Sequence, residues 1–263
     1  MMDSIISTCA IKDLEVWKQA SKRIIQFIPA KNYIVIVPEA ELDKFKKASP
    51  GNYLVINEND VLGTLNLVQI RNMLPDKFKF RAGWYLQQIL KIAVANNLND
   101  NDGFSLIWDA DTVPLQHIDF LNSENKLQFF VGHEFHQPYF STIKKLLGIE
   151  KIIEQSFIAQ SLPFRHEWIK AFIKCIEDRR KESWVNAIMN CSDLNNISGF
   201  SEYESIGTFV ARNFPGEIMI NNDKWERSGT EIFKRKFLSL SFLDLFASAN
   251  PSLYFISFEG WSS

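Results

Sequence analysis

The sequence predicts an α/β protein with a single, mostly parallel sheet flanked by helices, followed by a more helical C-terminal part. Three observations support this fold class. Strand-like and helix-like segments alternate through residues 1–56, which is typical of parallel βαβ units. A further apolar strand at 104–108 ends in two aspartates, and residues 165–190 carry mainly helical patterns. We therefore expect one domain over residues 1–263.

Composition and charge exclude several classes of protein. With 263 residues and 46% hydrophobic content, the chain can bury a large core. A net charge of -2 gives no basic field, so we expect no nucleic acid partner. The 3 cysteines form no CxxC pair, which argues against a zinc site or a disulfide framework and favours a cytoplasmic location. We expect no secretory signal, and no apolar run reaches the ~18–20 residues of a membrane span.

The N-terminal elements read as strand, helix, strand, helix, strand. We expect strands at 4–9, 33–37 and 53–56, and helices at 13–27 and 39–48. Ser7 and Thr8 lie at the carboxyl end of the first strand, a position suited to touching a base or a ribose. A solvated strand end would show the same residues.

The segment between the third strand and the next long helix is irregular. A connection as long as 57–80 inside a compact domain is often functional or partly helical. The clearest helix follows from Arg81 to Asn97, where Arg81, Tyr85 and Gln88 recur at i, i+4 and i+7 and share a polar face. Arg81 offers a fork of donors to phosphate or to an aspartate, although a plain surface arginine would show the same pattern.

Two aspartates follow the buried-type strand Phe104–Trp108 after a turn-forming run at 99–103. In extended backbone, Asp109 and Asp111 lie on the same side of the chain. The carboxyl end of such a strand is where open α/β sheets bind ligands. Burying two bare acids would be costly, so we expect a cation or a positively charged neighbour beside them. Carboxylate oxygens suit Mg²⁺ or Mn²⁺, which complete their shells with phosphate oxygens and water. The pattern therefore predicts a metal and nucleotide diphosphate site.

The second half begins with a strand at 128–131, which Gly132 ends. The segment from His133 to Tyr139 is rich in hydrogen-bonding side chains, but its spacing is not the H-E-x-x-H of zinc proteases. We interpret it either as a loop over the pocket or as an ordinary polar turn. A helix is expected from Ser141 to Leu147.

The C-terminal segments are less regular. We expect one or two helices within 165–190, and strands at 217–221 and 253–258 around an amphipathic segment at 231–246. The basic and apolar stretch that begins at Lys234 can lie on a lipid surface or begin a core-packing helix.

A further helix begins after Ser201. Ser201 is an N-cap and Glu204 completes a capping box, while Glu202 in the first turn gains from the helix dipole. Both acids thus have structural explanations. They also lie at the helix start on the ligand side of the sheet, where either can act as a general base.

Several segments in order carry a resemblance to a known group of proteins. They are I-W-D-A-D-T-V-P-L, preceded by R-A-G-W-Y-L-Q-Q and followed by H-Q-P-Y and G-F-S-E-Y-E-S-I-G-T-F. Over roughly residues 75–230 the chain resembles bacterial GT-A-fold glycosyltransferase-like proteins of surface-glycan biosynthesis. The resemblance implies a Rossmann-type sheet with a nucleotide-binding half at 1–115 and an acceptor-binding half at 116–263.

The resemblance also implies an activity and residue roles. A sugar would move from a nucleotide-sugar donor to a glycan or lipid-linked acceptor, in the cytoplasm or peripherally at the inner face of the membrane. Asp111 would bind Mn²⁺ or Mg²⁺ directly and Asp109 would assist at the ribose or metal. Thr8, Arg81, Trp84 and Gln88 would bind the donor, and His136 and Tyr139 would bind the acceptor. Glu202 is the first choice and Glu204 the second choice for the base of an inverting reaction.

The histidines of this chain depart from the pattern of metal-dependent relatives, which commonly add a histidine from the C-terminal part. The last histidine here is His166. Either His133 or His136 would therefore be the histidine ligand of the metal, or carboxylates, diphosphate and water would hold the metal without a histidine.

Three further classes of protein fit parts of the sequence. D-A-D-T-V also fits phosphatases that form an aspartyl-phosphate. Those require an acidic pair after a later strand, and the chain offers only Glu177-Asp178. A nucleotidyltransferase that shares the sheet type and a non-catalytic sugar-binding module are equally compatible with the strand and its aspartates.

Overall fold

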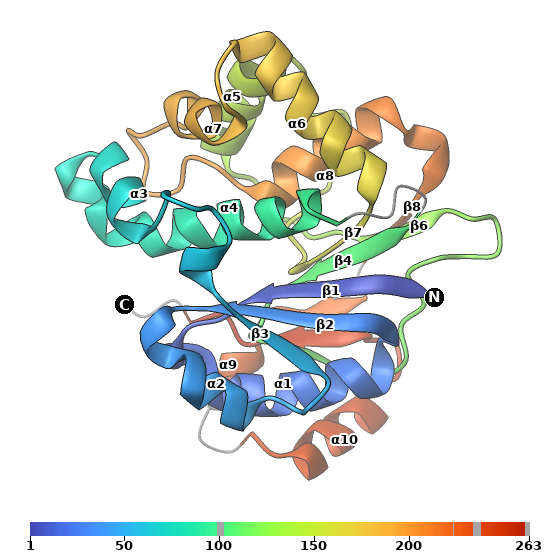
Figure 1. The fold of residues 1–263 in the computed structure, drawn as a ribbon. Helices are drawn as coiled ribbons and strands as arrows, with labels where there is room; N and C mark the ends of the chain where they lie inside the picture. Colours follow the sequence, from blue (N-terminus) through green and yellow to red (C-terminus); the bar gives the residue numbers. More distant parts are fainter. Residues whose placement is uncertain (99–102, 223, 234–237, 261–263) are drawn as a thin grey trace.

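The computed structural model describes residues 1–98, 103–222, 224–233 and 238–260, and it shows a central sheet between layers of helices (Figure 1). The strands are β1 Met2–Thr8, β2 Ala30–Val37, β3 Tyr53–Asn57, β4 Phe104–Trp108, β5 Thr112–Pro114, β6 Leu127–Phe130, β7 Ser161–Arg165, β8 Ile218–Asn221, β9 Trp225–Glu226 and β10 Phe255–Ser257. The helices are α1 Leu14–Phe27, α2 Leu42–Ala48, α3 Leu67–Met73, α4 Ala82–Asn96, α5 Gln137–Leu147, α6 His166–Arg180, α7 Trp184–Cys191, α8 Glu202–Asn213, α9 Gly229–Phe233 and α10 Leu240–Ala249.

The main sheet has the strand order β3-β2-β1-β4-β7. The first four strands are parallel, and β7 runs antiparallel to β4. The predicted mostly parallel sheet with flanking helices is therefore confirmed. The chain adds β2 and β3 on one side of β1 and then β4 on the other, so the strand order reverses between β1 and β4. The carboxyl ends of these two strands consequently form the topological switch point, where α/β proteins bind ligands.

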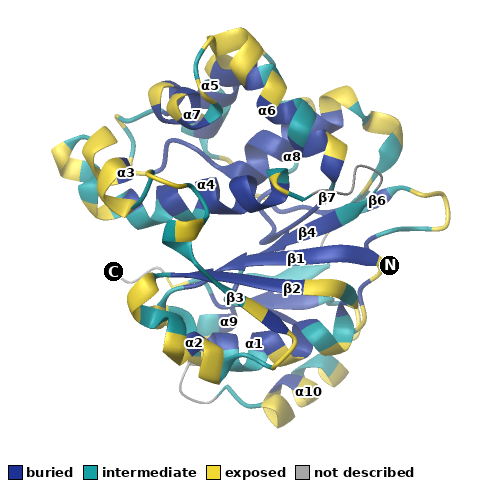
Figure 2. Cartoon of the chain, in the orientation of Figure 1, coloured by how far each residue is buried: buried dark blue, intermediate teal, exposed yellow. Residues whose placement is uncertain are grey.

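Alternating side chains of the sheet build two cores. Ile6 of β1 is in register with Ile34 and Ile107, and these three pack with α4, α6 and α8. The neighbouring Ile5 and Leu106 face the opposite core, which α1 covers. Figure 2 shows that the central strands are buried along most of their length. Because both faces of the sheet are covered, the strand sequences contain apolar runs and do not alternate between apolar and polar residues.

The C-terminal segment returns to the end of β4 through a small second sheet. β10 pairs antiparallel with β5 and parallel with β9. The amide of Phe258 donates to the carbonyl of Asp111 at 2.8 Å, and the hydroxyl of Thr112 donates to that of Ser257 at 3.1 Å. Residues more than 100 positions apart thus meet beside the two aspartates.

Most predicted elements are present, with some differences. The irregular segment 57–80 contains α3 and a 3₁₀ helix, and α5 begins before Ser141 because Pro138 starts it. Strand β7 was not predicted. The expected turn at 99–102 and the basic residues 234–236 lie outside the described residues.

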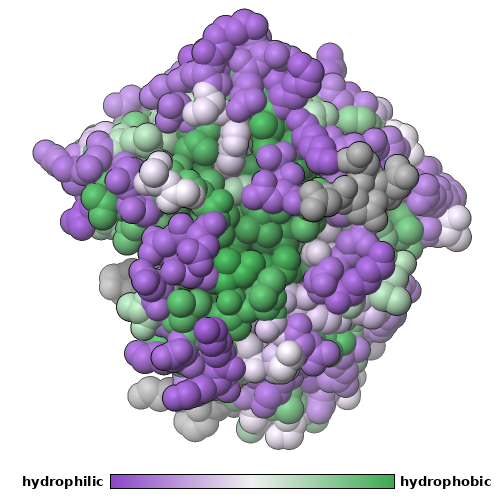
Figure 3. All heavy atoms as spheres, viewed as in Figure 1, coloured by the Kyte–Doolittle hydropathy of each residue, from purple (hydrophilic) through white to green (hydrophobic). Residues whose placement is uncertain are grey.

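Two features concern the surface. Among the described helices, none combines the length and apolar character needed to cross a bilayer. Figure 3 shows polar side chains over much of one face and an apolar area near its centre, where β3 is the outermost strand of the sheet. Leu54 of β3 is 58% exposed. Apolar exposure on this face is therefore concentrated beside the edge of the sheet.

Candidate active site

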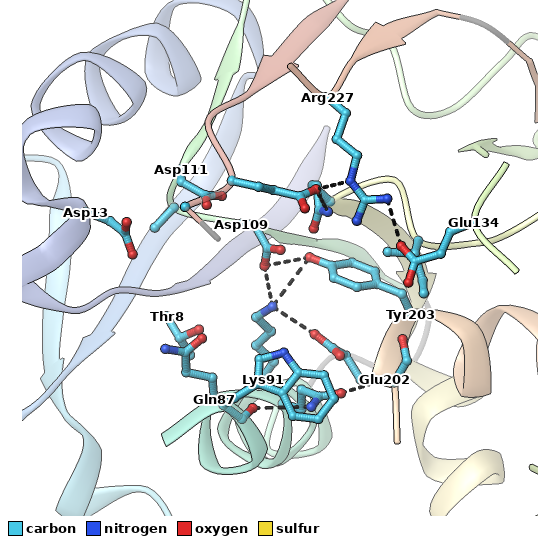
Figure 4. A pocket seen from close by; sticks show the side chains of 18 of the residues that line it. Thr8, Asp13, Gln87, Lys91, Asp109, Asp111, Glu134, Glu202, Tyr203 and Arg227 are labelled. Carbon is cyan, nitrogen blue, oxygen red and sulfur yellow. Dashed lines mark hydrogen bonds and ion pairs between the residues drawn. The ribbon is translucent and has the colours of Figure 1, made fainter. Parts of the chain in front are cut away.

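A pocket opens at the switch point between β1 and β4 (Figure 4). Its cavity volume is about 190 Å³, below the roughly 300–1,000 Å³ of sites that enclose a whole drug-sized ligand, so it fits part of a larger molecule. Seven parts of the chain line it: the end of β1 with the segment before α1, one face of α4 with the residue before it, the turn after β4, the segment 134–139, the segment before β7, the start of α8, and the C-terminal segment. The lining residues are Thr8, Lys12, Asp13, Arg81, Trp84, Gln87, Gln88, Lys91, Asp109, Ala110, Asp111, Glu134, Tyr139, Ile158, Gln160, Ser201, Glu202, Tyr203, Arg227, Glu259 and Gly260.

The two predicted aspartates lie at the carboxyl end of β4, but they do not share one side of an extended strand. The amide of Thr112 donates to the carbonyl of Asp109 at 3.0 Å, which closes a turn. The expectation of extended backbone is therefore wrong. Because the chain turns, the Asp109 carboxylate lies beside Lys91, whereas Asp111 lies toward Asp13 (Figure 4).

Lys91 is the centre of a buried charged network. Its ammonium donates to the carboxylate of Asp109 and, at 2.8 Å, to that of Glu202. The hydroxyl of Tyr203 donates to the same Asp109 oxygen at 2.8 Å. The amide of Glu202 in turn donates to the side-chain oxygen of Gln88 at 3.0 Å. Helices α4 and α8 and the turn after β4 are therefore joined by side chains at the pocket.

The protonation states of this network follow from burial and charge. Burial alone would lower the pKa of Lys91, but the carboxylates of Asp109 and Glu202 raise it above its usual value. Burial raises the pKa of Tyr203, and Asp109 raises it further, so the phenol stays a donor. Burial also raises the pKa of Glu202 against the opposing effect of the Lys91 ammonium. One cation thus serves two carboxylates.

Asp111 is the carboxylate that fits an added cation. Burial, followed by the charges of Asp109, Asp13 and Glu259, raises the pKa of Asp111 to about 8. Within the described parts of the chain, no lysine, arginine or histidine forms an ion pair with it. Those same parts contain no group of three or more His, Cys, Asp and Glu that could hold a metal ion. A metal here would therefore take much of its shell from ligand and water.

One face of α4 carries the expected donor-binding residues. The Arg81 guanidinium lies 4.3 Å from the centre of the Trp84 ring and donates to the Ser198 hydroxyl at 3.0 Å. The Gln88 amide donates to the carbonyl of Trp84 at 3.2 Å. Tyr85 does not line the pocket; its hydroxyl accepts from the amide of Gly199.

A second arginine closes the opposite side of the pocket. Arg227 pairs with Glu134 at 2.8 Å and with Glu259 at 2.7 Å (Figure 4). Glu259 also accepts from the side-chain amide of Gln160. The C-terminal segment is thereby tied to the loop before α5 through one guanidinium.

The two acids of the α8 start have different surroundings. Glu202 lines the pocket, whereas Glu204 does not. The Ser201 hydroxyl accepts from the amide of Glu204 as predicted, but the Glu204 carboxylate does not complete the capping box. It instead pairs with Lys151 and accepts from the amide of Phe157 at 3.0 Å. Because this carboxylate reaches another segment, the expected reciprocal cap does not form.

The structure brings most of the predicted residues together. Thr8, Arg81, Trp84, Gln88, Asp109, Asp111, Tyr139 and Glu202 line the pocket. His136 and Glu204 do not; His136 shares a hydrogen bond of 2.8 Å with the carbonyl of Ser198. Ser7 is also turned away, since its hydroxyl donates to the carbonyl of Trp108.

Sequence reasoning missed Lys91, Tyr203 and Arg227, and it included Glu134 only as part of the segment from His133 to Tyr139. Lys91 continues the helical spacing of Trp84 and Gln88, so extending that face by one turn would have found it. No local pattern marks Arg227, which reaches the pocket only through the return of the C-terminal segment.

The phosphatase interpretation lacks the acidic pair that it requires. Glu177 and Asp178 are exposed near the end of α6 and do not line the pocket. Asp178 pairs with Lys174 at 2.6 Å, and Glu177 accepts from the amide of Trp184. Both acids therefore make local contacts at the surface near the end of α6.

The fold is similar to several solved structures of glycosyltransferases. Mouse xyloside xylosyltransferase 1 has 10% sequence identity and a TM-score of 0.48, over 100% of this chain and 95% of the other. Galactosyltransferase LgtC with donor and acceptor sugar analogs has 13% identity and a TM-score of 0.45, over 99% and 88%. GlyE of Streptococcus pneumoniae TIGR4 has 9% identity and a TM-score of 0.41, over 99% and 55%. No curated protein matches the sequence. Residues 15–216 match the model of DUF6492, a family of unknown function, and the chain therefore belongs to that family.

Proposed function

We propose that this chain is a glycosyltransferase that moves a sugar from a nucleotide-sugar donor to a hydroxyl of a glycan or lipid-linked acceptor. The observation that carries the proposal is the set of charges around one pocket at the switch point. Asp109 and Asp111 enter it from β4, and Lys12, Arg81 and Arg227 line it from other segments. Carboxylates suit a divalent metal, and the cations suit a diphosphate.

A divalent metal fits the carboxylates of this site. Asp111 would hold Mn²⁺ or Mg²⁺ together with the second oxygen of Asp109, because burial and the neighbouring carboxylates of Asp109, Asp13 and Glu259 raise the pKa of Asp111 and a divalent cation would offset both effects. When bound, the metal would offset the charge of the leaving diphosphate. The small number of protein ligands suits an ion that keeps phosphate oxygens and water.

The cationic side chains would orient the donor. Arg81 is held over Trp84 and against Ser198, so its planar fork is preorganised to bind an oxyanion. Arg227 lies on the opposite side with two acidic partners that fix its position. Thr8 at the end of β1 is placed for the ribose or the base.

Lys91 would act as a positioning residue in this reaction. It neutralises Asp109 and joins it to Glu202 through contacts between protein side chains alone. A network fixed in advance needs no reorganisation when charge develops, which lowers the barrier.

Glu202 is the proposed base, in preference to Glu204. It lines the pocket, and burial raises the pKa of its carboxyl above the usual value, which makes the carboxylate a stronger proton acceptor. Glu204 is held by Lys151, Ser156 and Phe157 outside the pocket. Proton removal by Glu202 would support transfer with inversion.

A lipid-linked acceptor would bring the protein to the inner face of a membrane. Phe242 and Leu245 of α10 are 56% and 66% exposed, which suits peripheral contact from the cytoplasm. The wild type should bind anionic vesicles, and Leu245→Ser should bind them more weakly. This result would support the location at the membrane.

The test is a thermal-shift panel of nucleotide sugars with and without Mn²⁺, followed by product analysis. A donor at ~100 times its dissociation constant should add roughly 2.7 kcal/mol to stability. Asp111→Asn should abolish the metal-dependent part, and Arg81→Ala should weaken diphosphate binding. The matched controls are Asp119→Asn and Arg71→Ala, both at exposed positions outside the pocket. Absence of any nucleotide-sugar response, or turnover of phosphate monoesters alone, would overturn the proposal.

A further inference from the structure

A second cavity adjoins the candidate active site across the segment 134–140. Glu134 and Tyr139 of this segment line the candidate active site. Phe135 and Phe140, the next residue after each, line the second cavity instead. The same short segment therefore forms a wall of both cavities.

The floor of the second cavity is aromatic. Phe135 is 71% exposed, and its ring centre lies 4.9 Å from that of Phe140 at an angle of 52°. The cavity volume is about 620 Å³, within the roughly 300–1,000 Å³ of small-molecule sites. Two adjacent rings in a cavity of this size offer apolar ring faces to a ligand.

The rim of this cavity is polar and carries charges of both signs. Lys144 and Glu150 pair there at 2.6 Å, and the Lys151 ammonium lies 5.2 Å from the centre of the Phe140 ring. The other polar residues of the rim are Gln137, Ser141 and Glu154. Donors and acceptors around an apolar surface suit a ligand with many hydroxyls and an apolar ring face. The balance of two lysines and two glutamates favours a neutral sugar over an anionic headgroup or a strongly charged peptide.

We propose that this cavity is the acceptor subsite of the transferase and that it binds a sugar unit of a glycan, with Phe135 as the surface against which the ring stacks. The inference rests on the proposed function, and it gives the acceptor class as glycan. The shared wall links the two ends of the acceptor: Tyr139 and Glu134 face the reacting end, and Phe135 faces the sugar farther along.

The experiment compares three variants on a glycan array and in donor thermal shift. Phe135→Ala removes the stacking surface and Phe135→Tyr keeps it. Phe80→Ala is the matched control, because Phe80 is 69% exposed and lines neither cavity. The array identifies a glycan that the wild type binds. For that glycan, Phe135→Ala should raise the dissociation constant about 10-fold or more, as for a central aromatic contact. Phe135→Tyr and Phe80→Ala should bind it as the wild type does, and all variants should keep the donor response.

Three outcomes would overturn the inference. If no glycan on the array binds through Phe135 while the donor still binds, the subsite is wrong and the transferase proposal stands. If neutral vesicles or peptides bind through Phe135 and glycans do not, the occupant is wrong. If glycans bind through Phe135 but no nucleotide sugar binds the wild type, the cavity is a sugar-binding site without an acceptor role, and the proposed function fails with it.

Discussion

The Lys91 ammonium lies 2.8 Å from the carboxylate of Glu202, and each side chain is only 4% exposed. This pair joins α4 to α8 in the interior of the pocket wall. A buried pair contributes little net stability when complete, but removing one partner leaves a charge that water no longer solvates.

Replacing Lys91 by Met should therefore destabilise the fold by about 3–5 kcal/mol, the usual cost of leaving a buried charge unpaired. Chemical denaturation measures the free energy of unfolding. Lys144→Met is the matched control, because Lys144 and its partner Glu150 are 67% and 74% exposed, and no measurable loss is expected there. If Lys91→Met and Lys144→Met have the same free energy of unfolding, the ion pairs of Lys91 contribute no more to stability than those of an exposed lysine.

The two acids of the α8 start should separate activity from stability. Glu202→Gln leaves Lys91 paired with Asp109, so it should keep donor affinity and lower turnover by ~10²–10⁴-fold, the contribution of a positioned base. Glu204→Gln should keep turnover but lose about 1–3 kcal/mol of stability, since its partners Lys151 and Phe157 lose a charged acceptor. Steady-state kinetics and urea unfolding of both variants check this. The reverse pattern would assign the proton transfer to Glu204.

The raised pKa of Asp111 makes the stability of the protein depend on pH. With a folded pKa of about 8 and an unfolded pKa of about 3.9, the folded chain holds a proton that the unfolded chain has released between these values. Stability from this group is full below about pH 4 and is lost as the pH rises to about 8.

Asp111→Asn removes that titration. The melting temperature of Asp111→Asn relative to the wild type should therefore rise between about pH 5 and pH 8.5, measured with a chelator present. Asp43→Asn, at an exposed carboxylate of α2, should give a constant difference. If the melting temperature of Asp111→Asn also differs from that of the wild type by a constant amount over this pH range, the pKa of Asp111 is not raised.

Gly207 in α8 packs directly against Phe157. A Cβ at this position would lie 2.2 Å from the Phe157 ring, so Gly207→Ala should cost about 1–3 kcal/mol as an overpacked core. Gly83 in α4 has nothing within 4 Å of its Cβ position. Gly83→Ala should instead add roughly 0.4–1 kcal/mol, because alanine restricts the unfolded chain. If Gly207→Ala lowers the free energy of unfolding in urea and Gly83→Ala raises it, packing against Phe157, and not helix propensity, determines the effect at Gly207.

The sheet could be predicted because its signals are local. Runs such as Tyr33 to Val37 and Phe104 to Trp108 are apolar along their length, and turns or helical patterns bound them. β7 was missed because Pro163 interrupts the pattern, and an edge strand tolerates such a residue.

The site was only partly predictable because its decisive contacts span long distances in sequence. Lys91 lies among Leu90 and Ile92, where a lysine usually extends to solvent. Its burial depends on Asp109 and on Glu202, which is 111 residues away. The turn after β4 has the same origin, since it leads into β5, whose partner strand is β10.

The pairing of β5 with β10 also has a kinetic consequence. Thr112 and Ser257 are 145 residues apart, so the contact that fixes the turn of Asp109 and Asp111 closes a very long loop. Contacts of this separation form late, after local helices and hairpins, and a ribosome must have released almost the whole of this sequence before they can form. β10 contains only three residues, Phe255–Ser257, so it can also open locally without global unfolding. Amide exchange at Phe258 would then report the opening of the turn that holds Asp109 and Asp111, separately from the exchange of the main sheet.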